Sequence, residues 1–345
     1  MNPALPHALP TTMRPARLVV DYVEAAAPAP LLAADDVLAV LGFGNAAARH
    51  DDPRYLRVPL QPWNRAAALS APYEVWRANA PVARGRDGDI TWASDGQLLF
   101  GAIEIPESKA PGNAGIADAA QRAYASLIAF VRGSDHRHLL RIWNYLDAIT
   151  LGEGDAERYR QFCIGRARGF GDFDASNLPA ASAIGRCDDA RIIQVYWLAA
   201  REPGTPVENP RQLAAYRYPR QYGPQSPSFA RAMLPPAASA MPLLLSGTAS
   251  VVGHESRHGD CLESQLAETF ANFDSLIAAA RQHRPDLPAR FGAGSRLKVY
   301  VRDAADLPRV AAALDARLGP EVPTLLLHAA ICRRELRVEI DGVHG

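Results

Sequence analysis

The sequence predicts an α+β protein, built of layered sheets and helices, in which one structural unit occurs twice. Short segments of alternating apolar and polar residues, typical of strands, are interspersed with helical segments that carry an apolar stripe. From residue 90 onward the order strand–strand–helix–strand–helix–strand–strand occurs twice, each time over roughly 90–110 residues. The chain of 345 residues is long enough for two or three domains with ample cores. We therefore expect a duplicated sheet backed by helices.

Residues 1–85 are expected to form an N-terminal arm and an accessory segment. Apolar runs at 17–21 and 37–41 predict two strands, and an Ala- and Pro-rich stretch separates them. The second run leads into the glycine motif at 42–47, which is similar to a dinucleotide-binding turn. A dinucleotide fold needs a long helix next, and here Pro53 interrupts the chain before such a helix could be complete. We therefore interpret the motif as a plain turn.

The first repeated unit is expected over residues 86–201. Its predicted strands span 90–94, 98–105, 140–146, 180–185 and 191–199, and its predicted helices span 116–131 and 154–167. The first of these helices places Ala120, Tyr124, Leu127 and Val131 on one face. This pattern indicates a helix that packs its apolar face against a sheet.

The second repeated unit is expected over residues 241–345, and the segment 202–240 lies between the two units. The predicted strands of the second unit occur within 242–253, at 296–301 and within 325–340, and its predicted helices span 261–281 and 305–318. The intervening segment is rich in Pro, Arg and Tyr. A segment of that length without a periodicity of its own is more often functional or disordered than incidental. We interpret it as an active-site insertion, with a linker as the alternative.

The last predicted strand carries a carboxylate that could serve in catalysis. Alternation places Leu336, Val338 and Ile340 on one face and Glu339 on the other, between two aliphatic neighbours. A partly desolvated carboxyl group has a raised pKa and can act as a general acid near neutral pH. The alternative, which the spacing alone favours, is a solvated glutamate on the outer face of a sheet.

Charge and composition exclude several classes of function. Lys and Arg together number 37, as do Asp and Glu, and no long basic stripe occurs, so we expect no nucleic-acid partner. No apolar run approaches the ~20 residues that span a bilayer, and the Pro-rich N-terminus lacks the apolar core of a signal peptide. The four cysteines lie far apart without a CxxC pair, which is typical of a reduced protein. We therefore expect a cytoplasmic protein with no membrane partner.

The segment His254–His258 (HESRH) matches the HExxH motif of zinc hydrolases. That motif requires a helix, on which the two histidines face one metal ion. Here a strand-like run and Gly253 precede the motif, Gly259 follows it, and no third ligand stands out downstream. We interpret the segment as a loop between a strand and a helix, and we expect no metal.

Two further stretches combine aromatic residues with arginines. On the helix expected after residue 154, Tyr159, Phe162 and Arg166 share one face, because they are spaced by three and four residues. The stretch 208–231 holds three tyrosines and four arginines with almost no acid to pair them. Unpaired guanidinium groups beside aromatic rings suit a planar substrate that bears carboxylates. The alternatives are a surface helix with Arg158 and Arg160 solvated and a flexible basic linker.

The pattern of the second unit resembles the small RidA fold (YjgF-like, or chorismate mutase-like), a sheet backed by two helices. In that family the last strand carries a glutamate near its end, as Glu339 does here, whereas the first unit has Gln194 at the equivalent place. Most of the chain from about residue 90 to 342 also carries long motifs, namely RIWNYL, ERYRQFCIGR, ENPRQLAAYRYPRQYGPQSPSFARA, SGTASVVGHES and CRRELRVEIDG. Together these motifs resemble the chorismatase family, whose members have RidA-like folds.

The resemblance implies an enzyme without a cofactor that removes the enolpyruvyl side chain of chorismate as pyruvate and leaves a hydroxybenzoate. Glu339, on the last strand, would protonate the vinyl carbon as the general acid. Arginines would hold the two carboxylates of chorismate so that this carbon stays within reach of the acid. By match to the family motifs, the expected substrate contacts are Tyr159, Arg166, Tyr218 and Arg231, with Tyr216 and Arg220 as weaker candidates.

Cys332 bears on the identity of the product. In the benzoate-forming branch of the family a cysteine stands at this position, whereas a branched aliphatic residue marks the branch that releases a dihydroxycyclohexadiene carboxylate. The resemblance therefore implies an aromatic product, and it is greatest to the bifunctional synthases of 3- and 4-hydroxybenzoate that serve pigment and quinone pathways. Judged by composition alone, Cys332 is equally consistent with a small buried apolar residue.

Two other classes of protein remain open on the sequence alone. A non-catalytic RidA-type protein that binds a small carboxylate would need the arginines but not the acid. A RidA-like imine deaminase would need a carboxylate-binding arginine near Thr324 and Leu325, and none stands there. A duplicated chain can satisfy its own sheet edges, yet dimers are common, so a monomer and a homodimer are both expected states.

Overall fold

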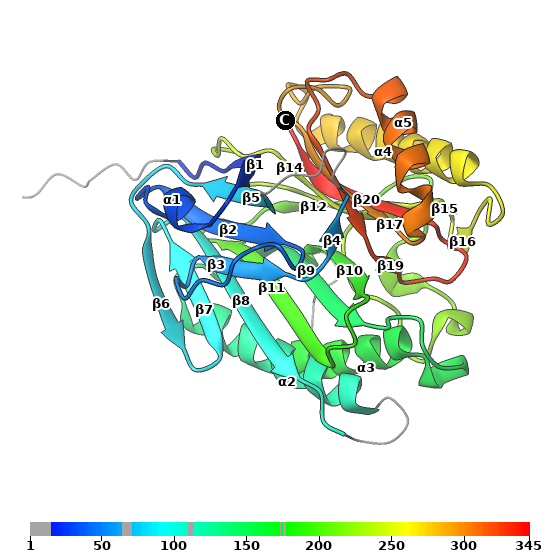
Figure 1. The fold of residues 1–345 in the computed structure, drawn as a ribbon, viewed down its shortest axis with the longest axis horizontal. Coiled ribbons are helices and arrows are strands. Elements are labelled where there is room, and N and C mark those ends of the chain that lie inside the picture. The colour runs from blue at the N-terminus through cyan, green and yellow to red at the C-terminus, as the bar shows by residue number, and fades with distance from the viewer. Residues whose placement is uncertain (1–14, 64–70, 110–113, 173, 175–176) are drawn as a thin grey trace, which may run out of the picture.

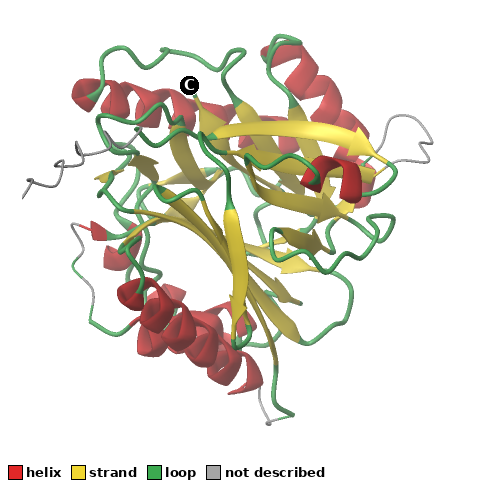
Figure 2. Cartoon of the chain, turned by 90° about the vertical axis from the view of Figure 1, so that its left-hand side faces the viewer, coloured by secondary structure: helices red, strands yellow, loops and turns green. Residues whose placement is uncertain are grey.

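The computed structural model (Figure 1) describes residues 15–63, 71–109, 114–172, 174 and 177–345. These residues form two seven-stranded sheets, a four-stranded sheet and a two-stranded hairpin. Figure 2 shows the sheets in the middle of the molecule and the long helices on its outside. The predicted α+β class is confirmed.

The first seven-stranded sheet contains the first repeated unit. Its strands are β6 (Ala83–Asp87), β7 (Ile90–Ser94), β8 (Leu98–Pro106), β9 (His138–Asp147), β10 (Ala180–Arg186) and β11 (Ile192–Ala200), and its helices are α2 (Ala114–Gly133) and α3 (Arg158–Phe170). The order is β19-β10-β9-β11-β8-β7-β6, with β9 and β10 parallel and β19 (Ala330–Ile331) at one edge. The elements predicted for this unit are present, but α3 begins later than expected because a 3-10 turn, Gly154–Ala156, precedes it.

The second seven-stranded sheet has the same order of strands. Its strands are β12 (Thr205–Val207), β13 (Ala232–Leu234), β14 (Leu243–Ala249), β17 (Arg296–Val301), β18 (Thr324–His328) and β20 (Val338–His344), and its helices are α4 (Leu262–His283) and α5 (Leu307–Arg317). The order is β12-β13-β14-β20-β17-β18-β4, which matches the first sheet position by position when the first sheet is read from β6 to β19, and β17 and β18 are again parallel. The predicted repeat is therefore confirmed.

The prediction that 242–253 holds both opening strands of the second unit is wrong. The strand that pairs with β14 is β13, which lies in the preceding Arg- and Tyr-rich segment. The residues after β14 instead form a small hairpin of β15 (Val251–Val252) and β16 (Glu255–Ser256). Gly253, with a φ of 60°, makes the turn between β15 and β16, and the apolar run itself is interrupted at Ser250, between β14 and β15.

The N-terminal segment forms a four-stranded sheet that repeats the central part of the same order. Its strands are β1 (Val19–Ala25), β2 (Val37–Phe43), β3 (Tyr55–Val58) and β5 (Ala71–Arg77), with a short helix α1 (Ala29–Leu32). In the order β1-β5-β2-β3 the first two pairs are antiparallel and the last is parallel, as in β14-β20-β17-β18. The segment is thus a third copy of the strands without the two long helices. Gly44, at a φ of 79°, makes the turn after β2, as expected, and the next regular element is β3.

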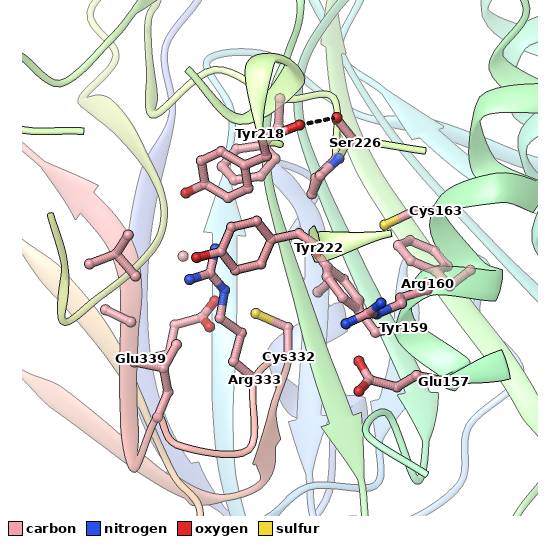
Figure 3. Close-up of a pocket in the computed structure, with 18 of the residues that line it drawn as sticks. Glu157, Tyr159, Arg160, Cys163, Tyr218, Tyr222, Ser226, Cys332, Arg333 and Glu339 are labelled. Carbon is pink, nitrogen blue, oxygen red and sulfur yellow. Dashed lines mark hydrogen bonds between the residues drawn. The ribbon is translucent and has the colours of Figure 1, made fainter. Parts of the chain in front are cut away.

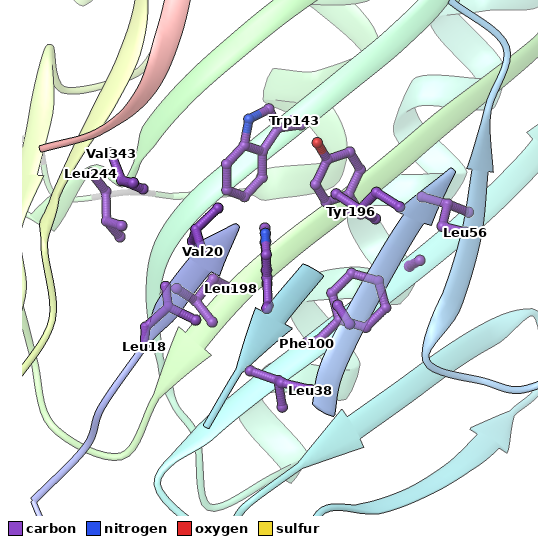
Figure 4. Close-up of a cluster of buried hydrophobic side chains, with 14 of the residues drawn as sticks. Leu18, Val20, Leu38, Leu56, Phe100, Trp143, Tyr196, Leu198, Leu244 and Val343 are labelled. Atoms are coloured by element: carbon purple, nitrogen blue, oxygen red, sulfur yellow. The ribbon is translucent and has the colours of Figure 1, made fainter. Parts of the chain in front are cut away.

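Short strands and a common core join the three sheets. β4 (Gln61–Pro62), from the N-terminal segment, pairs with β18, and β19, from the second unit, pairs with β10. A buried cluster then fills the space between the sheets (Figure 4). In it Trp76 of β5 lies beside Trp143 of β9 and Tyr196 of β11, and the last two rings stack at 4.7 Å. A site between the sheets therefore has rigid walls.

The long helices cover the outer faces of the two larger sheets. Apolar residues of α2 and α3 pack on the first sheet, and those of α4 and α5 pack on the second. Gly165 lets α3 approach α2 closely, because a Cβ atom at this position would overlap the backbone of Ala117. No helix in the described part of the chain is both long and apolar enough to cross a membrane.

Candidate active site

A cavity of about 490 Å³ opens between the two repeated units (Figure 3). The first unit contributes α3 and residues of β9 and β10, and the second contributes β14, β20 and the turn before β20. Loops of the segment 208–231 line the remaining side. The cavity wall includes all six residues selected from the sequence, which are Tyr159, Arg166, Tyr218, Arg231, Cys332 and Glu339.

Glu339 is the second residue of β20, opposite Tyr300 of β17 on one side and Ala249 of β14 on the other. Its exposed fraction is 5%, so the alternative of a solvated surface glutamate is wrong. Within the described ranges, no donor makes a hydrogen bond to its carboxyl group. Burial, together with the neighbouring Asp341 carboxylate, raises the pKa of Glu339 to about 8. The carboxyl group therefore holds its proton at neutral pH.

Gly247 provides the space that this carboxyl group occupies. It lies where the pairing of β14 with β20 is irregular, between Leu245 and Thr248. A Cβ atom on Gly247 would overlap the carboxyl group of Glu339 and would stand 3.1 Å from Oγ of Ser182. The absence of a side chain at this position therefore decides which rotamer Glu339 can adopt.

Replacing Gly247 with alanine is expected to lower kcat at least about tenfold with little loss of stability. The overlap is with the far end of a flexible side chain, so the carboxyl group moves and the backbone stays in place. Steady-state kinetics and thermal melting measure the two effects separately. Gly133→Ala is the matched control, since a Cβ atom there meets nothing within 4 Å. An unchanged kcat in Gly247→Ala would contradict the placement of the carboxyl group.

Arg231 and Tyr218 form one wall of the cavity. Arg231 stands directly before β13 and is 4% exposed. Its Nη2 atom donates hydrogen bonds to the hydroxyl of Tyr218 at 2.7 Å and to the carbonyl of Leu213 at 2.8 Å. Its guanidinium group also lies over the ring of Phe229, 5.1 Å from the centroid. The Nε atom has no partner among the described residues, so the guanidinium group of Arg231, although fixed by its other hydrogen bonds, keeps one unsatisfied N–H group.

Arg166 lies on α3, one turn after Phe162 and two turns after Tyr159, and all three residues line the cavity as their spacing predicts. It is 5% exposed, and its guanidinium group lies over the rings of Tyr124 at 5.0 Å and Phe170 at 5.3 Å. Its Nη2 atom has no partner in the described part of the chain. A buried cation with an unpaired N–H group is costly, and an anionic ligand would satisfy it.

Other arginines of the same two stretches have acidic partners outside the cavity wall. Arg158 is 2% exposed and forms a two-pronged ion pair with Glu107, so a solvated helix face is wrong for this residue. Arg220 pairs with Asp155 at 2.9 Å. The structure brings neither of the weaker candidates, Tyr216 and Arg220, to the cavity. Spacing could not show this, because the acids come from distant parts of the sequence.

The turn before β20 carries Cys332 and Arg333 into the cavity (Figure 3). Burial raises the pKa of the Cys332 thiol, which is therefore neutral at physiological pH. The guanidinium group of Arg333 lies over the ring of Tyr222 at 4.1 Å and over that of Tyr218 at 5.2 Å. Arg333 and Tyr222 were not among the site residues predicted from the sequence. The available signal was the position of Arg333 directly after Cys332 and of Tyr222 within the Tyr- and Arg-rich stretch.

One arginine outside the cavity wall holds this turn in place. Arg302, directly after β17, donates hydrogen bonds to three carbonyl groups, those of Ile331, Arg333 and Leu336. The first of these residues is buried and belongs to β19, which pairs with β10 of the first unit. Cys332 is thus fixed relative to both units.

The equivalent place in the first unit carries no acid. Gln194 stands opposite Tyr145 of β9, just as Glu339 stands opposite Tyr300 of β17. The side-chain amide of Gln194 donates to the carbonyl of Arg57 in β3 at 3.0 Å. The N-terminal sheet thus covers this position, whereas the position of Glu339 borders an open cavity.

The segment His254–His258 forms no helix. Gly253 makes the turn of the β15–β16 hairpin, and Glu255 is paired with Arg257 at 2.8 Å. His258 lies 3.2 Å from Glu268 of α4. Among the described residues, no group of three or more His, Cys, Asp or Glu side chains could hold a metal ion. The segment is therefore not helical, as expected, but it is not wholly a loop, because Glu255 and Ser256 form β16.

The cavity combines a protonated carboxylic acid with guanidinium groups and aromatic rings. Guanidinium groups bind carboxylates in two-pronged hydrogen bonds, and aromatic rings pack on planar ligands. A neutral carboxylic acid in such a place can transfer its proton to a carbon atom of a bound anion. The arrangement therefore suits acid catalysis on a planar substrate that carries carboxylates.

Comparisons with known proteins relate the chain to one family. Residues 74–199 match the family model described as chorismatase FkbO/Hyg5-like, N-terminal. A 3-hydroxybenzoate synthase of Streptomyces hygroscopicus is 33% identical over 291 residues, which cover 81% of this chain and 84% of that protein. A chorismatase of Streptomyces rapamycinicus is 34% identical over 280 residues, covering 78% and 81%. The crystal structure of a chorismatase has a TM-score of 0.83 at 31% identity, covering 97% of this chain and 100% of that chain.

Proposed function

The chain belongs to the chorismatase family, and on this premise we propose that it converts chorismate to pyruvate and a hydroxybenzoate. The observation that supports the proposal most directly is the burial of Glu339, whose pKa of about 8 makes it a proton donor at neutral pH. The similarity to a 3-hydroxybenzoate synthase supports an aromatic product, 3-hydroxybenzoate, 4-hydroxybenzoate or both.

In the proposed reaction Glu339 transfers its proton to the vinyl carbon of the enolpyruvyl ether. The new C–H bond leaves an oxocarbenium ion. If water attacks this ion, the hemiketal breaks its bond to the ring oxygen and gives pyruvate and a ring diol, which becomes a hydroxybenzoate by losing one water. If instead the ring hydroxyl attacks the ring carbon that bears the ether oxygen, that C–O bond breaks and pyruvate leaves with its electron pair. Pyruvate and hydroxybenzoate together contain all the atoms of chorismate, so the ring becomes aromatic without an external oxidant. The proton that the ring loses in this step restores the acid form of Glu339.

The two buried arginines have the role of holding the two carboxylates of chorismate. Arg231 and Arg166 each keep an N–H group that has no partner among the described residues. Two fixed cations on a rigid wall would hold the vinyl carbon within reach of Glu339. Tyr218 and Tyr159 supply hydroxyl contacts and shape, since both line the cavity.

Incubation of the purified, EDTA-treated protein with chorismate tests the proposal. We expect pyruvate in a coupled assay and 3- or 4-hydroxybenzoate by liquid chromatography. Pyruvate together with a non-aromatic diol would contradict the expected product and leave the class of reaction standing. A melting shift with chorismate and no pyruvate would contradict the activity and favour a binding protein.

Replacing Cys332 with valine is expected to shift the product away from 3-hydroxybenzoate. The side chain lines the cavity on the fixed turn beside β20, so a branched side chain there changes the space around the bound ring. The two side chains are similar in volume, and stability should change by less than about 1.5 kcal/mol. Chromatography of the reaction mixture gives the product ratio. Cys187→Val, at an exposed position, is the control, and an unchanged ratio in Cys332→Val would contradict a role in selectivity.

We further propose that the protein acts in the cytoplasm as a monomer or a homodimer. The four cysteines of the described chain are free, which is common in reducing compartments. Each of the two large sheets takes an edge strand from another part of the same chain, which a monomer can provide. Size-exclusion chromatography with light scattering distinguishes the two states.

A further inference from the structure

A buried charge network lies behind Glu339 and has no part in the proposed reaction steps. Asp341 stands two residues further along β20 and is completely buried. Its Oδ2 atom accepts hydrogen bonds from Ser182 at 2.7 Å, from Arg141 at 3.1 Å and from Tyr300 at 3.1 Å. Ser182 and Arg141 belong to the first unit, so the carboxylate of the second unit is held across the interface of the two sheets.

Lys298 extends this network into the N-terminal sheet. Its Nζ atom lies 3.9 Å from Oδ1 of Asp341 and 3.0 Å from Glu74 of β5, and it donates to the hydroxyl of Tyr196 at 3.2 Å. Burial alone would lower the pKa of Lys298, but the two carboxylates outweigh burial and raise it, so the ammonium group is charged. Two anions and two cations, from all three sheets, are thus fixed in the core.

Glu339 and Asp341 are neighbouring carboxyl groups in opposite surroundings. They are two residues apart on one strand and therefore lie on the same face of the sheet. Asp341 is surrounded by donors and cations, whereas no donor within the described ranges bonds the carboxyl group of Glu339. When two nearby carboxyl groups differ in this way, the one without donors is the one that more readily keeps a proton.

We propose that Asp341 is a positioning residue whose fixed negative charge, held behind Glu339, keeps that acid protonated between turnovers. This inference rests on the proposed function, in which Glu339 donates a proton. Three arginines near Glu339 favour its ionised form. They are Arg141 of β9, Arg231 before β13 and Arg302 after β17. Tyr159 of α3 and Cys332 of the turn are neutral neighbours. Asp341 is the anion that opposes these cations.

The pH–rate profiles of two charge variants test the proposal. Asp341→Asn removes the negative charge and keeps the shape, so the alkaline limb of kcat should move to lower pH. Arg141→Gln removes a cation, so the limb should move to higher pH. A shift of one pH unit changes the rate above the limb about tenfold. Tyr300→Phe removes a hydrogen bond to Asp341 without removing a charge, and this matched control should leave the limb in place.

Structural damage would lower kcat at every pH, but it would not move the limb in opposite directions in the two variants. If one of the two charge variants fails to melt cooperatively and is therefore misfolded, the direction in which the alkaline limb moves in the other variant tests the role of Asp341. A limb that stays at the wild-type pH in a folded Asp341→Asn or Arg141→Gln variant would overturn the role of Asp341.

A second readout follows the titration of Glu339 without turnover. The difference in melting temperature between the protein and Glu339→Gln changes with pH until the folded protein has released the proton of Glu339. In an Asp341→Asn background this change should end at a lower pH. Absence of pyruvate from the wild-type protein would contradict the proposed function and leave this readout intact. An end point at the wild-type pH would overturn the inference even in an active enzyme.

Discussion

Replacing Glu339 with glutamine is expected to lower kcat for pyruvate release by about 10²–10⁴, the usual contribution of a general acid. Glutamine has nearly the same shape and keeps the packing of β20 against β14, but it has no proton to transfer to carbon. Because the substrate-holding arginines remain, chorismate should still shift the melting temperature of the variant. In the wild-type protein, kcat should fall about tenfold per pH unit above the pKa of Glu339, near 8.

The same variant is expected to be more stable than the wild-type protein at neutral and alkaline pH. The pKa of Glu339 rises from an ordinary value of 4.5 to about 8, so between these values the folded protein holds a proton that the unfolded chain has released. The stability of the wild-type protein therefore falls as the pH rises from about 4.5 to about 8, and then levels off. Glutamine lacks this dependence, and we expect a gain of about 4 kcal/mol at pH 8.

Thermal melting over a range of pH, combined with steady-state kinetics, measures both effects. Glu255→Gln is the matched control, because Glu255 is exposed and paired with Arg257 outside the cavity wall. It should alter neither kcat nor the pH dependence of stability. A Glu339→Gln variant with undiminished turnover would remove Glu339 from the proposed mechanism.

Replacing Arg166 with methionine is expected to cost about 2–4 kcal/mol of transition-state binding, roughly a hundredfold in kcat/KM. The guanidinium group is buried and has a free N–H group, so a substrate carboxylate is its natural partner. Methionine keeps the contacts with Tyr124 and Phe170 but leaves that carboxylate without its partner in the cavity. Removing a buried cation without a full set of partners should leave the free protein at least as stable as before.

Two further variants separate charge from geometry at this position. Arg166→Lys keeps the charge and loses the two-pronged hydrogen bond, so its kcat/KM should lie between those of the wild-type and methionine forms. Arg220→Met removes an exposed arginine whose partner is Asp155, and it should change kcat/KM and stability little. Equal kcat/KM for Arg166→Met and the wild-type protein would exclude Arg166 as a carboxylate anchor.

Elements with strong periodicity were predictable along the chain. The strand expected at 296–301 is β17 within the same bounds, and the helix expected at 261–281 is α4, Leu262–His283. The third copy of the strands, in the N-terminal segment, was missed. It lacks the two long helices that mark the unit in a sequence, and its pairing of β5 with both β1 and β2 joins residues far apart in the chain.

Arginine partners could not be predicted from local composition. The stretch 208–231 contains almost no acid, which favoured a row of unpaired arginines. In the fold, Glu268 of α4 pairs with Arg211, and Asp155 pairs with Arg220, so these two arginines have partners elsewhere. Arg231, in contrast, lies in the cavity wall. Ion pairs of this kind depend on the chain path between distant segments, which local spacing does not record.

The sequence by itself determined the repeated unit, the strand that carries Glu339, and the helical face that places Tyr159 and Arg166 side by side. Each of these follows from periods of two or 3.6 residues, or from motifs that are local in the chain. The tertiary structure decided that the face of β20 with Glu339 is buried and that Asp341 lies in a network with Arg141, 200 residues earlier in the chain. The acidity of a carboxyl group depends on the water and charges that surround it in space, and here these surroundings come from segments that meet only in the fold.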